Sequence, residues 1–286
     1  MNYYSSRMKP WITWIALAIV LTTLTGFVTA RFRTGDEIMK EVKNRHTANT
    51  EVELIKMITL DNQGNSQERE FISLIRQDDK GNFSYLIRFF APQDVRGVTL
   101  LTLEKPNGDF EQYLHLPALG QTRKIVGSQR SQSFMGSDFT FEDLRKEQPE
   151  EYVYNRLLDE KVEGRDCYVI MSAPRDANKL KATGFSNRLL FIDKEDFNIL
   201  KVEFFDANRE LIKTFQGFDY NSVEVDGPSK RPRRAVMTNR NKGSTSILAL
   251  QKSRLNVPLK DDWFSVKKLD SWDAQTDEEL MALFNK

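Results

Sequence analysis

The sequence has a single cysteine, Cys167, and only two histidines, His46 and His115, among its 286 residues. One cysteine excludes an intramolecular disulfide, so the hydrophobic core alone must stabilise the fold. A zinc site would need mostly carboxylate ligands, and neither a CxxC nor an HExxH motif is present. A GxSxG turn to activate a serine and a GxxxxGK phosphate loop are absent as well. We therefore predict a protein that is not an enzyme and has no cofactor or metal.

Charge is scarce in one stretch only, at the N-terminus. Arg7 and Lys9 precede an uncharged run, Trp11–Ala30, which ends in small residues like those of a cleavage site. This layout is typical of a secretory signal peptide, residues 1–30. An uncleaved inner-membrane anchor is the alternative, but several threonines and Gly26 weaken it. We therefore expect export to the periplasm.

The expected mature chain, residues 31–286, is almost neutral. Loss of Arg7 and Lys9 leaves 40 basic residues against 41 acidic ones, a net charge of −1 with neutral histidines. A balanced, exported chain gives no indication of nucleic acid as a partner. Its length suits one large domain, and no repeat or low-complexity linker divides it. We predict one domain over residues 31–286.

Short β-rich runs separated by Gly and Asn turns make up most of the chain. Capping boxes at Thr34–Glu37 and Thr276–Glu279 predict a helix over residues 35–48 and a short C-terminal helix. The expected strands are Glu51–Leu60, Glu68–Arg76, Phe83–Phe90, Val98–Leu103, Phe110–Leu116, Tyr152–Glu163, Asp166–Ser172, Arg188–Asp193, Ile199–Phe205, Ile212–Tyr220, Arg234–Thr238 and Ser246–Asn256. Such regular spacing predicts a mainly β fold with one curved antiparallel sheet or a barrel.

Two expected strands are apolar on both faces, at Tyr168–Met171 and Leu189–Ile192. Covered core on both faces would explain this pattern. An apolar cavity on the concave face of the sheet is the alternative, and the pattern alone favours the core.

The segment Ser133–Leu144, SFMGSDFTFEDL, concentrates apolar residues in a loop that Gly136 interrupts. An exposed loop of this composition either buries its apolar side chains or binds an apolar ligand with them. No catalytic or metal-binding pattern surrounds it.

Four segments together resemble the LolA-like outer membrane lipoprotein-sorting proteins of Gram-negative bacteria. In order along the chain, these are Asp94–Leu101, Tyr113–Leu119, Thr122–Ile125 and Ser133–Leu144. The resemblance points to the branch associated with RND/MMPL-type transporters and extends weakly from Thr34 to Leu269. Gly120–Gln121 and His115 depart mildly from the family pattern.

The resemblance implies a fold and a role. The fold is an incomplete (half) antiparallel barrel whose helices cover an apolar cavity on the concave face. The role is that of a periplasmic carrier, a monomer that holds the acyl chains of a lipid or lipoprotein. Its partners would be an inner-membrane RND/MMPL-type transporter and an outer-membrane acceptor.

The same resemblance suggests which residues bind and which close the cavity. Expected ligand-binding residues are Phe134, Met135, Phe139, Phe141, Leu119 and Tyr113. Aromatic rings and thioethers adapt to chains of varied shape. Expected latch residues are Arg96, Arg123, Asp138, Glu142 and Asp143, with the acids pairing to either arginine when the lid closes. The plainer alternative is an ordinary core with a solvated acidic edge or helix cap.

A dense basic run comprises Lys230, Arg231, Arg233 and Arg234. It is either a solvated, proline-stiffened loop or a docking site for an anionic membrane or an acidic transporter patch.

Two other functions fit the same chain. A sensor of this fold would bind mislocalised lipids or lipoproteins and form a stable complex with a membrane receptor. A lipid-processing enzyme is disfavoured, because no activated nucleophile or metal set is visible.

Overall fold

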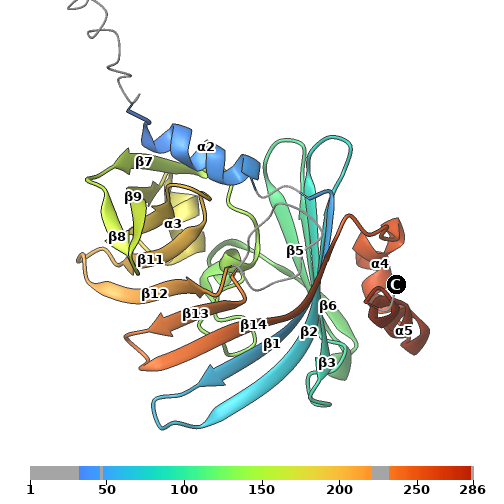
Figure 1. Ribbon diagram of the computed structural model, residues 1–286. Coiled ribbons are helices and arrows are strands. Elements are labelled where there is room, and N and C mark those ends of the chain that lie inside the picture. The colour runs from blue at the N-terminus through green and yellow to red at the C-terminus, as the bar shows by residue number, and fades with distance from the viewer. Residues whose placement is uncertain (1–31, 46–47, 221–231, 285–286) are drawn as a thin grey trace, which may run out of the picture. The chain divides into compact units, whose positions relative to one another are not determined.

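A computed structural model describes residues 32–45, 48–220 and 232–284 (Figure 1). Residues 34–286 form one compact unit. The strands within the described residues are β1 (Thr50–Leu60), β2 (Ser66–Gln77), β3 (Phe83–Ala91), β4 (Thr99–Glu104), β5 (Phe110–Leu116), β6 (Gln121–Ile125), β7 (Tyr152–Arg156), β8 (Glu160–Val162), β9 (Arg165–Pro174), β10 (Asn187–Asp193), β11 (Ile199–Phe205), β12 (Leu211–Phe218), β13 (Arg234–Asn239) and β14 (Ser244–Leu255). The α-helices are α2 (Gly35–Arg45), α3 (Ala177–Thr183), α4 (Val266–Asp270) and α5 (Ala274–Ala282).

All the strands belong to one curved antiparallel sheet, as the sequence predicted. Their order is β6-β5-β4-β3-β2-β1-β14-β13-β12-β11-β10-β9-β7, and β8 also pairs with β9. The sheet consists of two meanders, β1–β6 and β7–β14, joined where the first strand pairs with the last. This joint runs from the pair Glu51 and Leu255 to the pair Leu60 and Thr245. The sheet is therefore open, with β6 at one edge and β7 at the other.

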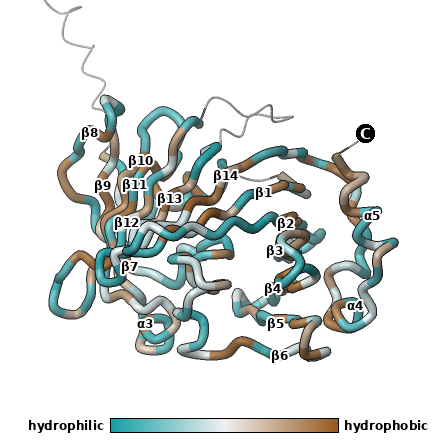
Figure 2. Tube along the Cα trace, turned by 90° about the horizontal axis from the view of Figure 1, so that it is seen from below, coloured by the Kyte–Doolittle hydropathy of each residue, from teal (hydrophilic) through white to brown (hydrophobic). Residues whose placement is uncertain are grey.

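A short helix lies between the two edges of the sheet. In Figure 2, α3 is seen between β7 and β6. It contacts the 3-10 helix η2 (Gly127–Ser131), which follows β6 directly. Gly184 ends α3 with a φ of 73°, and a Cβ there would lie 3.1 Å from the Cβ of Ser131. Glycine suits both the left-handed backbone and the close approach to η2.

The two faces of the sheet carry different cores because side chains alternate along each strand. In β3, Leu86 packs with Trp263, which lies next to α4. The neighbouring residues Ile87 and Phe89 pack on the opposite face with Phe134. Figure 1 shows α4 and α5 outside the curve of the sheet. The face bearing Phe89 is therefore the concave one, called the inner face below.

The two strands with apolar residues on both faces contribute to core on both sides. Ile170 and Leu190 belong to an inner cluster that also contains Ile38 and Met39 of α2. Val169 and Phe191 belong to a smaller outer cluster. The described helices therefore pack on both faces of the sheet. Helix α2 packs with the inner core, while α4 and α5 cover the outer face of the first meander.

Helix α2 begins as predicted, since Thr34 and Glu37 form a reciprocal capping box. The Glu37 amide donates to Thr34 Oγ1 at 3.2 Å, and the Thr34 amide donates to Glu37 Oε2 at 2.9 Å. The predicted start of the C-terminal helix is wrong. Asp273 caps α5 by accepting the Thr276 amide, so Thr276 lies inside the helix.

One predicted strand, Tyr152–Glu163, is divided in two. β7 and β8 both pair with β9. The three residues between them, Leu157–Asp159, lie opposite only two residues of β9. The extra residue forms a bulge that interrupts the ladder. Strand β6 and helices α3 and α4 were not predicted.

The predicted signal peptide and residues Lys230 and Arg231 lie outside the described residues. None of the helices described is long and apolar enough to cross a membrane.

Candidate functional site

The segment Ser133–Leu144, called the inner loop below, fills the inner face of the sheet. Phe134 and Phe141 belong to the inner cluster of the first meander, and their rings lie 5.5 Å apart. Phe134 also lies 5.7 Å from the ring of Phe89 in β3. Both side chains are almost completely buried. Met135 packs partly buried against the same cluster.

Phe139 packs on the second meander instead. It belongs to the inner cluster of the second meander, with Phe204 and Met237. The Phe134 amide donates to the carbonyl of Phe139 at 2.8 Å, so the loop folds back on itself. Gly136, with a φ of 75°, supplies the left-handed residue that this turn needs. The inner loop therefore joins the two inner clusters.

Polar contacts fix the inner loop to strands distant in sequence. Asp138 accepts hydrogen bonds from Ser244 at 2.6 Å and from Ser246 at 2.8 Å, both in β14. Asp143 accepts one from the Lys213 ammonium in β12 at 2.8 Å. Burial raises the pKa of Asp143, but Lys213 and the hydrogen bonds from Thr140 outweigh it, and the pKa lies below its usual value. The carboxylate is therefore charged and paired at neutral pH.

A buried ionic network surrounds the end of the inner loop. Glu142 Oε1 accepts from the Arg145 guanidinium at 2.7 Å and also from the Lys179 ammonium. Both cations also contact Glu151, Lys179 at 2.7 Å. Glu142, Arg145 and Lys179 are each less than one tenth exposed. This network connects the inner loop to α3.

The predicted latch pairing is not the one found in this structure. Arg96 and Arg123 are exposed, whereas the acids of the inner loop point inward to Lys179, Lys213 and the β14 serines. The acids face the concave side because their loop lies inside the sheet. They anchor the loop, but with partners that the sequence did not indicate.

Two other predicted ligand residues lie away from the inner face. Tyr113 packs with the outer core beneath α4 and α5, because it alternates with the inner residue Leu114 along β5. Leu119 lies in the 3-10 helix η1 (Pro117–Leu119) and is 63% exposed. The structure therefore brings together Phe134, Met135, Phe139 and Phe141, but not these two.

Of the basic run, only Arg233 and Arg234 are described, and both are exposed. Arg234 donates to Asp219 at 2.8 Å. The docking role of the run stays a prediction.

A cavity of about 170 Å³ is lined both by the inner loop and by the second meander. Its apolar wall comprises Phe139, Phe185, Phe204, Phe215 and Met237, and its polar wall comprises Glu142, Asp143, Arg145, Glu147, Tyr152 and Arg188. Glu147 is paired with Arg188 and accepts a hydrogen bond from Tyr154 at 2.5 Å. The cavity is therefore amphipathic, with charges that are largely neutralised in pairs.

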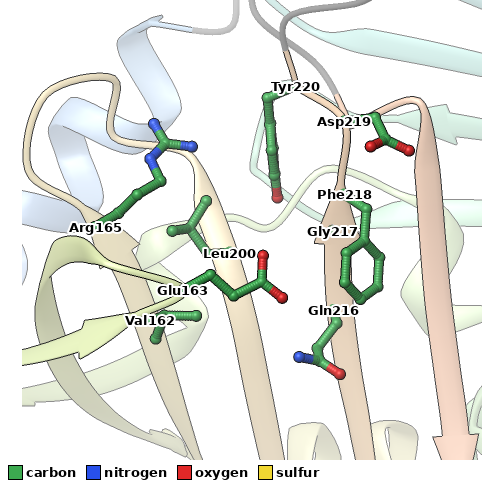
Figure 3. Close-up of a pocket in the computed structure, with 9 residues that line it drawn as sticks. All are labelled: Val162, Glu163, Arg165, Leu200, Gln216, Gly217, Phe218, Asp219 and Tyr220. Atoms are coloured by element: carbon green, nitrogen blue, oxygen red, sulfur yellow. The ribbon is translucent and has the colours of Figure 1, made fainter.

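A larger pocket of about 390 Å³ lies on the other side of the second meander (Figure 3). Its side chains come from β8, β9 and the turn between them, from β11, and from the end of β12 and the two residues that follow it. Two of its polar groups are bonded within the fold: Tyr220 donates to the carbonyl of Ile199 at 2.8 Å, and Arg165 donates to Asp196 at 2.9 Å. This pocket does not touch the inner loop.

The residues that hold the inner loop were not predicted from the sequence; they include Lys179, Lys213, Ser244, Ser246, Arg69 and Gln112. The sequence indicated the orientation of Ser246 only, because Ser246 lies two residues before the apolar Leu248 and therefore on the same face of the strand. Nothing in the sequence relates Lys213 to Asp143, seventy positions away. Among the described residues, no group of three His, Cys, Asp or Glu side chains is placed to hold a metal ion.

Comparison with known proteins places this architecture among lipoprotein-sorting-like folds. A family model for uncharacterized proteins matches residues 81–271, more than half of the chain. A domain from Vibrio parahaemolyticus, provisionally described as an outer membrane lipoprotein-sorting protein, is 30% identical. The match covers 82% of this chain and 98% of that domain, with a TM-score of 0.76. No curated protein matches the sequence.

Two further solved structures share the fold. A DUF1329 family protein from Desulfovibrio piger is 25% identical over 82% of this chain and 97% of its own, with a TM-score of 0.75. A LolA superfamily protein from Nitrosomonas europaea has a TM-score of 0.64 at 18% identity, over 83% of this chain and 100% of its own. By the extent of the family model and the identity to the Vibrio domain, the chain belongs to the family of that lipoprotein-sorting-like domain, and its fold is LolA-like.

Proposed function

We propose that this protein is a periplasmic, non-enzymatic carrier that takes the acyl chains of a lipid or lipoprotein onto the inner face of its sheet. The inner loop is the observation that carries the proposal. It covers the inner face with aromatic side chains, yet side-chain bonds to β12, β14 and α3, rather than a strand pairing, hold it there. An acyl chain would take the place of these rings when the loop moves out.

The free energy gained by burying an acyl chain is largely offset by the free energy lost when the loop leaves the inner face. Burying one large apolar side chain is worth about 2 kcal/mol, so Phe134, Phe139 and Phe141 together contribute about 6 kcal/mol. Twelve methylenes of an acyl chain gain about 10 kcal/mol on leaving water. Opening the loop also breaks the bonds of Asp138 to β14 and those that the Met135 and Phe141 carbonyls accept from Arg69 and Gln112, which offsets part of the difference. The net gain is modest, as a carrier that must release its cargo requires.

The outer face of the first meander does not offer this space. It is covered by α4 and α5, whose Leu269 and Leu280 are completely or almost completely buried. A chain bound on the inner face would be shielded from water by the sheet behind it and by the displaced loop in front.

Cellular context belongs to the same proposal. Export by the N-terminal segment would place the carrier between two membranes, with an RND/MMPL-type transporter as donor and an outer-membrane acceptor. The family match does not extend to the branch associated with such transporters, so membership of that branch is part of the proposal. The exposed Arg233 and Arg234 would contribute to docking on an anionic surface.

Lipid transfer between vesicles tests the proposal. Donor vesicles carry a fluorescent phospholipid whose emission is quenched, and acceptor vesicles carry none. Residues 31–286 at a substoichiometric concentration should accelerate the appearance of fluorescence, and organic extraction of protein purified from a periplasm should yield lipid or acylated protein. A folded protein that neither accelerates transfer nor carries any acyl chain would contradict the proposal.

A further inference from the structure

The amphipathic cavity beside the inner loop contains an unused hydrogen-bond acceptor. Glu142 Oε1 is occupied by Arg145 and Lys179. Glu142 Oε2 has no hydrogen-bond partner among the described residues, although the side chain is only 6% exposed and lines the cavity. A buried carboxylate oxygen left without a donor costs free energy, so its presence points to a missing partner.

A second polar group on the same cavity wall is also unused. Tyr152 is 3% exposed and lines the cavity, and its hydroxyl makes no hydrogen bond within the described part of the chain. The Arg188 guanidinium lies 4.4 Å from its ring and fixes its position. Burial raises the pKa of Tyr152 well above its usual value, so the hydroxyl keeps its proton and can donate or accept.

The size of the cavity restricts what these two groups can contact. A volume of about 170 Å³ is close to that of a cavity that holds one benzene molecule. It takes a small polar group and a few methylenes, but not a whole lipid. The rings of Phe204 and Phe215 on the opposite wall provide the apolar contact. Phe139, Glu142 and Asp143 of the inner loop form part of the cavity wall. The cavity would open to the space of the acyl chain when the part of the loop before Glu142 moves outward, while Glu142 stays bound to Arg145 and Lys179.

We propose that this cavity binds the polar linkage of the cargo, a hydroxyl or amide N–H adjoining the acyl chain, with Glu142 Oε2 accepting its hydrogen and Tyr152 making the second contact. This inference rests on the proposed carrier function and adds a preference to it. Acyl chains that carry a hydrogen-bond donor at their head are selected over esters that lack one.

Two probes with the same chain test this preference. Monolauroylglycerol carries two hydroxyls beside its acyl chain, and methyl laurate carries none. Each competes with a fluorescent fatty-acyl probe for the folded protein, and the ratio of their Kd values measures selection of the donor. This ratio cancels the contribution that the common chain makes.

Two variants remove the proposed contacts. Glu142→Gln lowers stability, because Arg145 and Lys179 then keep only the Glu151 carboxylate, whereas Tyr152→Phe disturbs the fold little. Glu142→Gln keeps an oxygen for Arg145 and Lys179 but presents a donor to the cavity. Tyr152→Phe removes a hydroxyl that bonds to none of the described residues. Each should weaken monolauroylglycerol binding about tenfold, the effect of one buried hydrogen bond, and leave methyl laurate within about twofold.

Tyr154→Phe is the matched control. Its hydroxyl bonds to Glu147 and does not line the cavity, so this change should lower stability and leave the ratio of Kd values unaltered. If Glu142→Gln and Tyr152→Phe also leave the ratio unaltered while both probes bind, the polar subsite is wrong and the carrier function stands. If neither probe binds the wild type, the carrier function fails together with the subsite.

Discussion

At the scale of single residues, the inner face is unusual in holding charges among aromatic rings. Lys213 is 7% exposed, and its ammonium lies 4.6 Å from the centre of the Phe204 ring as well as 2.8 Å from Asp143. A buried ion pair adds little net stability, but loss of one partner leaves a costly unpaired charge. These pairs therefore specify the position of the inner loop more than they strengthen the fold.

Asp143→Asn tests the pair with Lys213. At neutral pH the variant should be less stable than the wild type by about 3 kcal/mol, because the Lys213 ammonium loses its carboxylate. The pKa of Asp143 lies below its usual value of 3.8, since Lys213 and Thr140 outweigh the effect of burial. Such a carboxylate stabilises the fold above its unfolded pKa and loses this contribution as pH falls through the folded pKa. Urea unfolding should therefore show the difference shrinking below about pH 4.

Asp261→Asn provides the comparison. Asp261 pairs with Arg76 but is 93% exposed, so water screens the contact and the change should have little effect at either pH. A loss of stability in Asp143→Asn that is equal at pH 7 and pH 3 would contradict the assignment.

At the scale of elements, the sequence predicted what depends on local patterns. Strand β11 has the predicted bounds, and α2 starts at its predicted cap. The inner loop was singled out because apolar residues in a Gly-interrupted loop are a local pattern as well. Its anchors were missed because they come from β12, β14 and α3, and the face of Tyr113 was missed because register across strands decides it.

Short elements were missed for a related reason. Helix α3 has seven residues and an Asp176 cap that accepts two backbone amides, but no apolar stripe of helical length. It is stabilised by its contact with η2 across the gap in the sheet. Strand β6 is exposed at the edge, so only Ile125 among its residues is buried.

Thr34→Ala tests the contribution of the first capping box. Loss of Thr34 Oγ1 should destabilise α2 by about 1 kcal/mol and speed hydrogen exchange of its amides about fivefold. Thr34→Ser keeps the acceptor and should exchange like the wild type. Unchanged exchange in the alanine variant would show that packing of Ile38 and Met39 alone holds the helix.

Arg88→Met tests how α5 is fixed to the outer face. Arg88 in β3 donates to Asp277 at 2.5 Å and to Thr99 at 2.8 Å, and both charged side chains are buried. The variant leaves Asp277 unpaired and should lose about 3 kcal/mol in urea unfolding. Arg88→Met with Asp277→Asn removes the orphaned charge and keeps an acceptor for Trp272, so it should regain part of this loss. A double variant no more stable than the single one would contradict this account.

At the scale of the whole unit, the inner loop is the element that both meanders share. The sheet itself joins them only through β1 and β14. Phe134 packs on the first meander, Phe139 on the second, and Asp138 on β14 between them. Movement of this one segment would therefore open both inner clusters together. The proposed carrier function depends on that movement.

A disulfide that holds the inner loop in place tests this dependence most directly. The Ser246 hydroxyl donates to the Asp138 carboxylate at 2.8 Å, so these two side chains face each other and Asp138→Cys with Ser246→Cys would place two thiols side by side. Burial raises the pKa of the native Cys167 to about 11, which keeps that thiol protonated and unreactive. Binding of a fluorescent fatty-acyl probe is measured on the same protein, oxidised and then reduced. The account predicts that the oxidised form binds at least about a hundredfold more weakly, since the roughly 10 kcal/mol of chain burial needs the loop to leave. Equal affinity of the oxidised and reduced forms would contradict it.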